Sequence, residues 1–573
     1  MHSHRQALDR REPAKQAANG ERTSAGHVYF APREGHRGVS LRSVASALRQ
    51  AYLELDPRSL GLGRIGLGLL LLVDLFRRVP WIRDIYSNSG LLPNHTVLWR
   101  PPSERLFSLF FCASLPDEVA LLFVFAGICF SLFLIGYRTR LFHLLSLMFC
   151  VSLHNRVVFI ENGGAVATVC VLLWTAFMPL GARFSLDALL RERRRASASE
   201  PTEASVGAPA DRNPPFRSLV VPAFLLQLSA IYYFNFVHKS GPTWHDGTAV
   251  HYVLWQERIV THLGLWVREQ VPFAITRALT HGTLLIEASA PLLLLLPVGW
   301  RVTRPIALLA LASLHIGIAL LVNVGVFSAA MLSFYPFLLA RAHWDWLERR
   351  RILTGALCQR VRAAARRLAT RLEPLLAWLA ARRPPSPAAS LAGWRRGAGL
   401  MRELLVALTC VIVLFEVLVA NPAVPRTLKF NRPDWMVAPI LYTHLFEGWS
   451  MFAPDAPRSD MMVFIDAVTR DGRHIDPLNQ IGSRSAVLPV RDIPPRLGHD
   501  SFFCDYTLRV PDATAYHQAF TEWILRYPQR TGSPADEIVS FEAHVVEHTS
   551  PAPGEPAPSN VRDRVFLRFP SRS

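Results

Sequence analysis

A lysine at the end of a strongly apolar segment raises the question of base chemistry. In IYYFNFVHKSGPTWHDGTAVHY, residues 231–252, aromatic and aliphatic residues lead directly into His238 and Lys239, and a Ser-Gly-Pro turn follows. Burial among apolar residues disfavours the charged ammonium form, so a buried Lys239 can act as a free amine that accepts a proton near neutral pH. The alternative is a lysine whose stem lies in lipid while its amine reaches the headgroups. Sequence position alone slightly favours this second role.

Other ionisable side chains stand in apolar surroundings further along the chain. They are His281, Glu287 and His315, and Trp244 follows Lys239 closely. A lone histidine in a membrane segment often just hydrogen-bonds a neighbouring backbone group, but three such groups together with Lys239 favour a polar site. No HxxxH or CxxC spacing occurs among them, so we expect no metal.

Two further polar features interrupt apolar sequence. Asp74 lies inside a predicted span and is followed by Arg77 and Arg78. Carboxylates in lipid tend to face a partner, so a structural role is favoured over a catalytic one. The segment HNRVVFIENGG, residues 154–164, places several polar side chains, among them Asn162, at a predicted helical hairpin. This segment fits an exposed turn and the wall of a cavity equally well.

The elements that carry these residues are predicted to be membrane helices. A transmembrane helix needs about 20 mostly apolar residues. Candidate spans lie near residues 60–80, 115–136, 141–160, 164–182, 219–238, 282–300, 304–324, 326–342 and 402–420. The sequence therefore predicts an all-α polytopic membrane bundle of about nine helices.

The distribution of charge predicts the orientation of this bundle. The chain has 62 Lys and Arg against 44 Asp and Glu, a net charge of +18, and 50% hydrophobic residues. The positive charges gather in short segments between apolar runs, which is typical of cytoplasmic loops and does not demand nucleic acid. We expect a multi-pass protein of a cell inner membrane or an ER-type membrane. Its N-terminus would be cytoplasmic and its C-terminal domain extracytoplasmic.

Composition divides the chain into five parts. Residues 1–58 are predicted to be a basic, mostly disordered cytoplasmic tail, 59–342 the transmembrane domain, and 402–420 the last span. Residues 343–401 form a basic amphipathic segment that we expect on the anionic inner leaflet. Residues 421–573 are predicted to be a small, mostly β domain with a hairpin at Asp471-Gly472. Its expected strands include CDYTLRV (504–510), and residues 514–528 are expected to form one amphipathic helix.

The segment GLGRIG at 61–66 matches the pattern GxGxxG. A dinucleotide site needs a preceding strand, whereas this segment continues directly into a predicted span. Close helix packing at Gly61, Gly63 and Gly68 is the better explanation.

Several of these segments together resemble the vitamin K-dependent gamma-glutamyl carboxylases and their bacterial relatives, the HTTM (horizontally transferred transmembrane) proteins. The resemblance covers about residues 60–340 and the start of the tail. The segments that carry it are FVHKSGPTWHDGTAVHY, THGTLLIEASAPLLLLLP, LHIGIALLVNVGVFSAAML, FMPLGARFSLD and GWSMFAPDAPRSDMMVFIDAVTRDGR. Each segment alone is a weak signal, whereas the combination is specific.

The resemblance implies an enzyme that uses reduced vitamin K or a related quinone, O2 and CO2 to carboxylate glutamate side chains. Lys239 stands at the position of the family's base and would deprotonate the reduced quinone. Oxygen would turn the resulting anion into a strong base that removes a γ-proton from glutamate, and the carbanion would add to CO2. The residues expected to position quinone and substrate, or to carry protons, are Trp244, His281, Glu287, His315 and Asn162.

The chain departs from the animal carboxylases in two places. Their Asn-Asn-His element corresponds here to Glu161-Asn162-Gly163-Gly164, without the histidine, and the C-terminal domain is shorter. The alternative is an HTTM-family membrane protein without carboxylase activity. Such a protein would act in the maturation or export of a secreted peptide, or as a membrane scaffold. A disulfide between Cys112 and Cys504 is a hypothesis that rests on their predicted location on the outer side.

Overall fold

The computed structural model describes residues 41–99, 106–198, 214–350, 352, 355–382, 392–443, 445–479, 481–484 and 501–570. It separates into two compact units, Met1–Ala47 and Leu48–Ser573. Helix α1 (Leu41–Tyr52) begins in the first unit. The tail predicted over 1–58 was expected to be mostly disordered: its last part contains this helix, and residues 1–40 lie outside the described residues.

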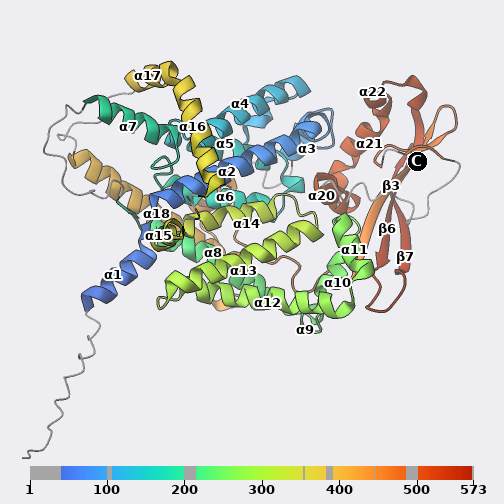
Figure 1. Ribbon diagram of the computed structural model, residues 1–573. Coiled ribbons are helices and arrows are strands. Elements are labelled where there is room, and N and C mark those ends of the chain that lie inside the picture. The colour runs from blue at the N-terminus through green and yellow to red at the C-terminus, as the bar shows by residue number, and fades with distance from the viewer. Residues whose placement is uncertain are drawn as a thin grey trace, which may run out of the picture. The chain divides into compact units, whose positions relative to one another are not determined.

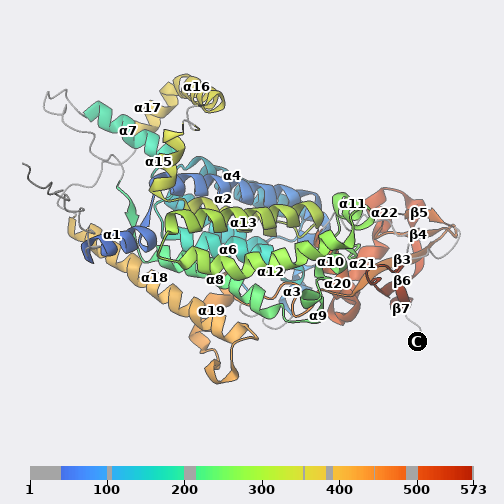
Figure 2. The same ribbon diagram turned by 60° about the horizontal axis from the view of Figure 1, so that its bottom comes forward.

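The second unit begins with a bundle of helices that run alongside one another (Figures 1 and 2). A short antiparallel pair, β1 (Glu54–Leu55) and β2 (Phe216–Arg217), accompanies it. The helices are α2 (Pro57–Arg78), α3 (Asn94–Leu98), α4 (Pro116–Ile135), α5 (Thr139–Arg156), α6 (Gly163–Ala176), α7 (Leu186–Ala198), α8 (Val220–His238), α9 (Pro242–His245), α10 (Ala249–Leu254), α11 (His262–Gln270), α12 (Phe273–Leu295), α13 (Trp300–Leu321) and α14 (Phe327–Phe334).

Helices of membrane-spanning length confirm the polytopic character in part. Among the described residues, 6 helices are long and apolar enough to cross a membrane: Pro57–Tyr86, Pro116–Ile135, Val220–His238, Phe273–Leu295, Trp300–Leu321 and Arg396–Ala420. Two predicted spans correspond to the shorter apolar helices Gly163–Ala176 and Phe327–Leu338. The predicted span 141–160 corresponds to α5, which is not among the six. Its sequence carries Arg140, His143, His154, Asn155 and Arg156, and these residues reduce its apolar character.

The glycines of α2 allow close contacts with neighbouring segments, as predicted. The helix begins at Pro57 because Asp56 caps it by accepting a hydrogen bond from Arg58 N at 2.8 Å. A Cβ atom on Gly61 would lie 2.6 Å from Arg183 O, and one on Gly68 would lie 2.9 Å from Leu134 Cα. A Cβ on Gly63 would lie 2.4 Å from the ring of Phe337.

The packing at Gly63 leads to a first prediction. Phe337 is fully buried, so its ring has little room to move away from an added methyl group. Gly63→Ala is therefore expected to destabilise the protein by about 1–3 kcal/mol through overpacking. Gly66→Ala is the matched control, because a Cβ there meets nothing within 4 Å. Thermal unfolding of the purified protein in detergent checks the prediction, and equal melting temperatures for the two variants would contradict it.

The C-terminal domain combines one sheet with several helices. The antiparallel sheet has the order β5-β4-β3-β6-β7. Its elements are β3 (Ser459–Thr469), β4 (His474–Asp476), β5 (Ile481–Arg484), β6 (Ile538–Thr549) and β7 (Ser559–Phe569), and the helices are α19 (Asp434–Thr443), α20 (Ser501–Arg509), α21 (His517–Leu525) and α22 (Tyr527–Thr531). The predicted hairpin at Asp471-Gly472 is confirmed, and Gly472 adopts a φ of +80° in its turn.

Two predictions for this domain need correction. CDYTLRV is not a strand but part of α20 and the turn that follows it, and Phe503, Tyr506 and Val510 recur at helical spacing on a buried face. The helix expected over 514–528 is divided into α21 and α22 around Arg526. The domain is therefore a mixed helix and sheet structure within the described residues.

Helices α20 and α21 join the C-terminal domain to one end of the bundle. Arg77 Nη1 donates to Ser501 Oγ at 2.5 Å, and Trp523 Nε1 donates to Asp84 Oδ1 at 3.0 Å. The Cys504 thiol donates to Arg258 O at 2.6 Å, and Cys112 is an exposed free thiol. The proposed disulfide between Cys112 and Cys504 is therefore not formed.

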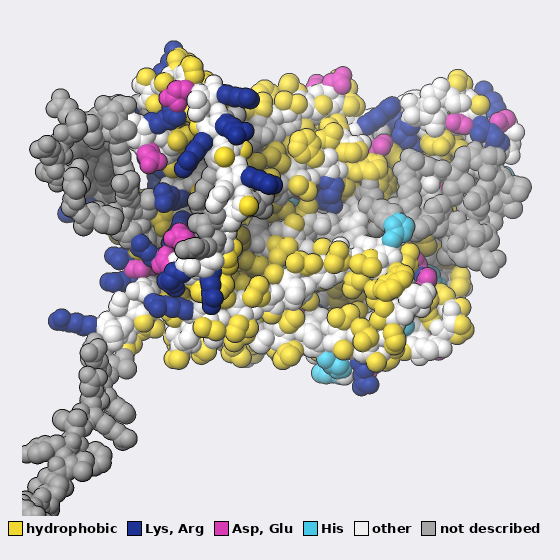
Figure 3. Space-filling model, viewed as in Figure 1, with side chains coloured by type: hydrophobic (Ala, Val, Ile, Leu, Met, Phe, Trp, Pro, Cys, Tyr) yellow, Lys and Arg dark blue, Asp and Glu magenta, His cyan; other side chains and the backbone are white. Residues whose placement is uncertain are grey.

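Basic helices lie at the other end of the bundle. After α14 come α15 (Arg341–Arg349), α16 (Ala356–Arg371), α17 (Glu373–Ala381) and α18 (Ala392–Ala420). In Figure 3, Lys and Arg side chains gather at the left of the view around α15 and α16, while hydrophobic side chains dominate the middle. The C-terminal sheet lies at the opposite side of the view in Figure 1.

Candidate active site

Lys239 lies at the end of α8 and pairs with a carboxylate from α12. Its Nζ lies 2.6 Å from Glu287 Oε1 and 2.5 Å from Oε2. The side chains are only 4% and 7% exposed, so the Lys239 amine lies inside the protein rather than at its surface. It is also not surrounded by apolar groups alone, because the Glu287 carboxylate faces it. Buried charges require a hydrogen-bonded partner, and the packing of α8 against α12 supplies one.

Trp244 forms an aromatic wall beside this pair. Lys239 Nζ lies 4.7 Å from the centroid of the Trp244 ring. The Trp244 indole N–H donates to Phe452 O at 2.8 Å, and Gly241 N donates to Pro454 O at 2.9 Å. The segment around Lys239 is therefore fixed against the segment GWSMFAPDAP, about two hundred residues later in the chain.

His315 takes part in a buried chain of polar groups from three helices. Tyr232 Oη lies 2.8 Å from His315 Nε2 and 2.7 Å from Tyr335 Oη. His315 Nδ1 is buried and has no hydrogen-bond partner among the described residues. It can therefore accept or donate a hydrogen bond to a ligand.

A cavity of about 230 Å³ lies between the bundle and α20. Two of its lining residues contact groups near the Lys239 pair: the Phe327 ring lies 5.4 Å from that of His315, and Phe452 O accepts a hydrogen bond from Trp244. Ligand sites usually measure roughly 300–1,000 Å³, so this cavity suits one ring system or one side chain. Its lining residues are Asn162, Gly163, Arg258, Ile259, Asn323, Val324, Phe327, Met451, Phe452, Ser501, Cys504 and Asp505.

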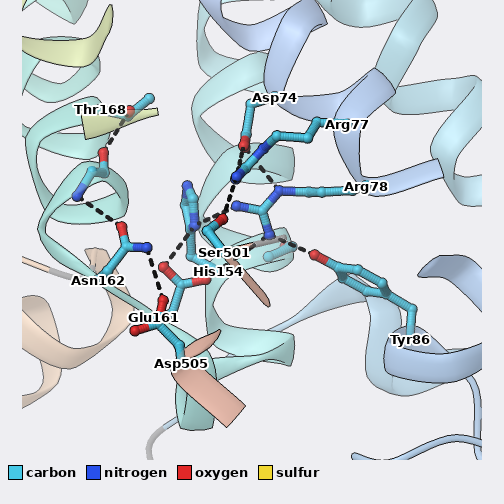
Figure 4. Close-up of polar contacts among 12 residues, drawn as sticks. Asp74, Arg77, Arg78, Tyr86, His154, Glu161, Asn162, Thr168, Ser501 and Asp505 are labelled. Carbon is cyan, nitrogen blue, oxygen red and sulfur yellow. Dashed lines mark hydrogen bonds and ion pairs between the residues drawn. The ribbon is translucent and has the colours of Figure 1, made fainter. Parts of the chain in front are cut away.

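A second polar network lies where α2, α5 and α6 meet α20 (Figure 4). Arg78 is its centre: Nε donates to Asp74 Oδ2 at 2.8 Å, and Nη1 donates to Tyr86 Oη at 2.5 Å. His154 Nδ1 lies 3.0 Å from Glu161 Oε2. Asp74 is fully engaged with arginines, which agrees with the structural role favoured from the sequence.

Asn162 connects this second network to the cavity. Its Oδ1 accepts from Gly164 N at 3.0 Å at the start of α6, and its Nδ2 donates to Asp505 Oδ2 at 3.2 Å. Burial raises the pKa of the Asp505 carboxyl, whereas Arg509 acts in the opposite direction. Both Asn162 and Asp505 line the cavity. The segment 154–164 therefore contributes to a cavity wall, which was one of its two predicted roles.

Two histidines of the sequence lie apart from the Lys239 pair. His281 is exposed on α12 and packs beside the turn at Gly247, so the structure does not bring it together with Lys239. His238 is held by backbone groups, since its Nδ1 lies 2.8 Å from Trp449 O and its Nε2 accepts from Ala423 N at 3.1 Å. These bonds give His238 a structural role.

Sequence reasoning missed several buried acids, among them Glu447. Its Oε2 accepts from Gln227 Nε2 and from Trp449 Nε1, each at 2.8 Å. Only the apolar neighbours in LFEGWSMF could have pointed to its burial. Tyr232 and Tyr335 were also missed, because tyrosines in apolar runs look like ordinary membrane-helix residues.

The side chains themselves determine what this site can bind. Aromatic residues Phe327 and Phe452 line the cavity. His315, whose ring lies 5.4 Å from that of Phe327, and Ser328, the next residue after Phe327, do not line it but have buried polar atoms, Nδ1 and Oγ, without partners among the described residues. Such a combination fits a hydroxylated aromatic ring.

Comparison of the chain with family models, with curated proteins and with solved structures finds no match.

Proposed function

We propose that this chain is a multi-pass membrane enzyme of the vitamin K-dependent carboxylase type that carboxylates glutamate side chains. The observation that carries the proposal is the buried Lys239–Glu287 pair beside the aromatic wall of Trp244, whose hydrogen-bond partner Phe452 lines a cavity. Nine spans would result if α5, α6 and α14 complete the six long helices. The concentration of arginines at the end away from the sheet supports a cytoplasmic N-terminus and an extracytoplasmic C-terminal domain (Figures 1 and 3).

The pair can act as one proton-accepting unit. A salt-bridged lysine and glutamate share one proton, either as ammonium with carboxylate or as amine with carboxylic acid. In both arrangements the pair can take up one further proton. Trp244 and the surrounding helices keep the pair buried. Exclusion of water protects strongly basic chemistry from being quenched.

The cavity has room for one of the two reactants, and the other would bind against the groups beside it. The reduced quinone, when bound with oxygen, supplies the strong base that glutamate chemistry requires. Phe327 and Phe452 would hold its ring, and His315 would bind a ring hydroxyl. Arg258 and Asn162 bring hydrogen-bond donors to the same cavity and would hold the glutamate carboxylate.

The direct experiment uses purified protein in lipid nanodiscs with reduced vitamin K, oxygen, labelled bicarbonate and a glutamate-rich peptide. We expect label in the peptide and quinone epoxide in the solution, both dependent on the protein. Epoxide without label would mean that the quinone chemistry stands and that the acceptor is a different peptide. Neither product from folded protein, with several quinones, would contradict the proposal.

A second candidate function is supported by the outer strand of the sheet. β7 is an edge strand of 11 residues, and its first half is exposed. Exposed edge strands can pair with an extended peptide. A protein without carboxylase activity that binds a secreted peptide for maturation or export would use this edge. Peptide binding without label or epoxide in the assay above would favour this function.

A further inference from the structure

Two adjacent hollows lie at the arginine-rich end of the bundle, and neither Lys239 nor Glu287 lines them. The first, of about 590 Å³, is bordered by the start of α5, the segment after α6 and the start of α7. The second, of about 500 Å³, is bordered by α5, the end of α6 and the first turns of α18 within its spanning segment. Arg140, Ala176 and Met178 line both, so the two hollows adjoin.

The first hollow carries an excess of positive charge. Arg138, Arg140 and Arg191 line it, together with a single acidic residue, Asp187. The Asp187 carboxylate already accepts from Arg138 N at 3.1 Å, and from Thr139 N at 2.8 Å and Thr139 Oγ1 at 2.7 Å. Arg140 is exposed, and its guanidinium has no hydrogen-bond or ion-pair partner among the described residues. This hollow therefore suits an anion that arginines can hold.

The second hollow is mostly apolar and is bordered in part by the candidate span Arg396–Ala420. Leu144, Phe177, Met401 and Leu405 line it. Leu144 and Leu405 are exposed, as expected of side chains that face acyl chains. Arg402, at its border, is already bound to Glu403 Oε1 at 2.6 Å, so its charge is largely satisfied.

We propose that the two hollows form a binding site for an anionic phospholipid from the leaflet on the arginine-rich side. Arg138 and Arg140 bind its phosphate, and an acyl chain lies along Leu144 and Leu405. A free phosphate would occupy only the first hollow. A phospholipid would occupy both, with its charged headgroup in the first hollow and an acyl chain in the adjoining apolar one. Basic pockets between membrane helices bind acidic headgroups in this way.

Native mass spectrometry of the full-length protein in a neutral detergent tests this site. Phosphatidylglycerol is titrated against phosphatidylcholine with the same acyl chains. The variant Arg138→Ala/Arg140→Ala removes two of the three exposed arginines of the first hollow and leaves Arg191, which is bound to Gly181 O. The matched control, Arg562→Ala/Arg564→Ala, removes the same charge from exposed positions on β7 that do not line either hollow.

We expect the wild-type protein to bind phosphatidylglycerol more tightly than phosphatidylcholine. The Arg138→Ala/Arg140→Ala variant should weaken phosphatidylglycerol binding by roughly 25-fold, about fivefold for each arginine, while the control stays within about twofold. Equal affinity for both lipids, or an equal loss in the control variant, would overturn the proposal. Displacement of phosphatidylglycerol by millimolar inorganic phosphate would also overturn it, because the site would then bind soluble phosphate.

Discussion

Lys239→Met and Glu287→Gln, made singly, are each expected to lower the rate of quinone epoxide formation by about 10²–10⁴, the usual contribution of a general base. The two effects should not add, because the pair accepts the proton as a unit. Lys239→Met also leaves the Glu287 carboxylate buried without its cation, which is expected to cost about 3–5 kcal/mol of stability. Epoxide formation and thermal unfolding are measured on the same preparations.

Lys429→Met is the matched control for these variants. Lys239 and Lys429 are the only lysines after residue 15, and Lys429 is neither buried nor near the cavity. We expect its replacement to leave both the rate and the melting temperature almost unchanged. A similar loss of epoxide in both lysine variants would mean that charge in general, rather than this pair, supports the activity.

Arg78→Ala is expected to destabilise the protein as strongly as Lys239→Met. The Arg78 side chain is 3% exposed and contacts Asp74 and Tyr86 directly. Its removal leaves the Asp74 carboxylate buried with only the partly exposed Arg77, and breaking such a pair costs about 3–5 kcal/mol. Thermal unfolding in detergent gives the measurement.

Arg77→Ala provides the comparison for Arg78→Ala. Arg77 binds the same carboxylate at 3.1 Å, but its side chain is 30% exposed. Water can replace part of this contact, so we expect a loss of about 1 kcal/mol or less. If Arg77→Ala destabilised the protein as much as Arg78→Ala, burial of Arg78 would not explain the effect.

Features that depend on a local pattern of residues could be predicted from the sequence. Long apolar runs located the six long helices, and the Asp471-Gly472 turn located the β3–β4 hairpin. The glycines at 61–68 indicated close helix contacts correctly. Helix α20 was misread because a short segment with apolar residues fits both a strand and a helix until its packing partner is known.

The arrangement of the site depended on contacts that no local pattern contains. Lys239 and Glu287 were each singled out, but their pairing results from the packing of α8 on α12, 48 residues apart. His281 and His315 are both histidines in apolar stretches of the sequence, yet His281 is exposed on α12 whereas His315 is buried. Asp505 and Glu447 come from segments whose burial is created only when the C-terminal part docks on the bundle.

The most direct test of the proton-accepting pair uses a variant that removes the chemistry and keeps the fold. Lys239→Met/Glu287→Met replaces the buried ion pair with apolar side chains of similar size, a change that is often neutral or stabilising. Single-turnover epoxide formation is measured for this variant and for the wild-type protein in nanodiscs, with the melting temperature of each. We predict a wild-type or higher melting temperature and an epoxide rate at least about a hundredfold lower. Epoxide formation at the wild-type rate by the folded variant would contradict the role of the pair as the base.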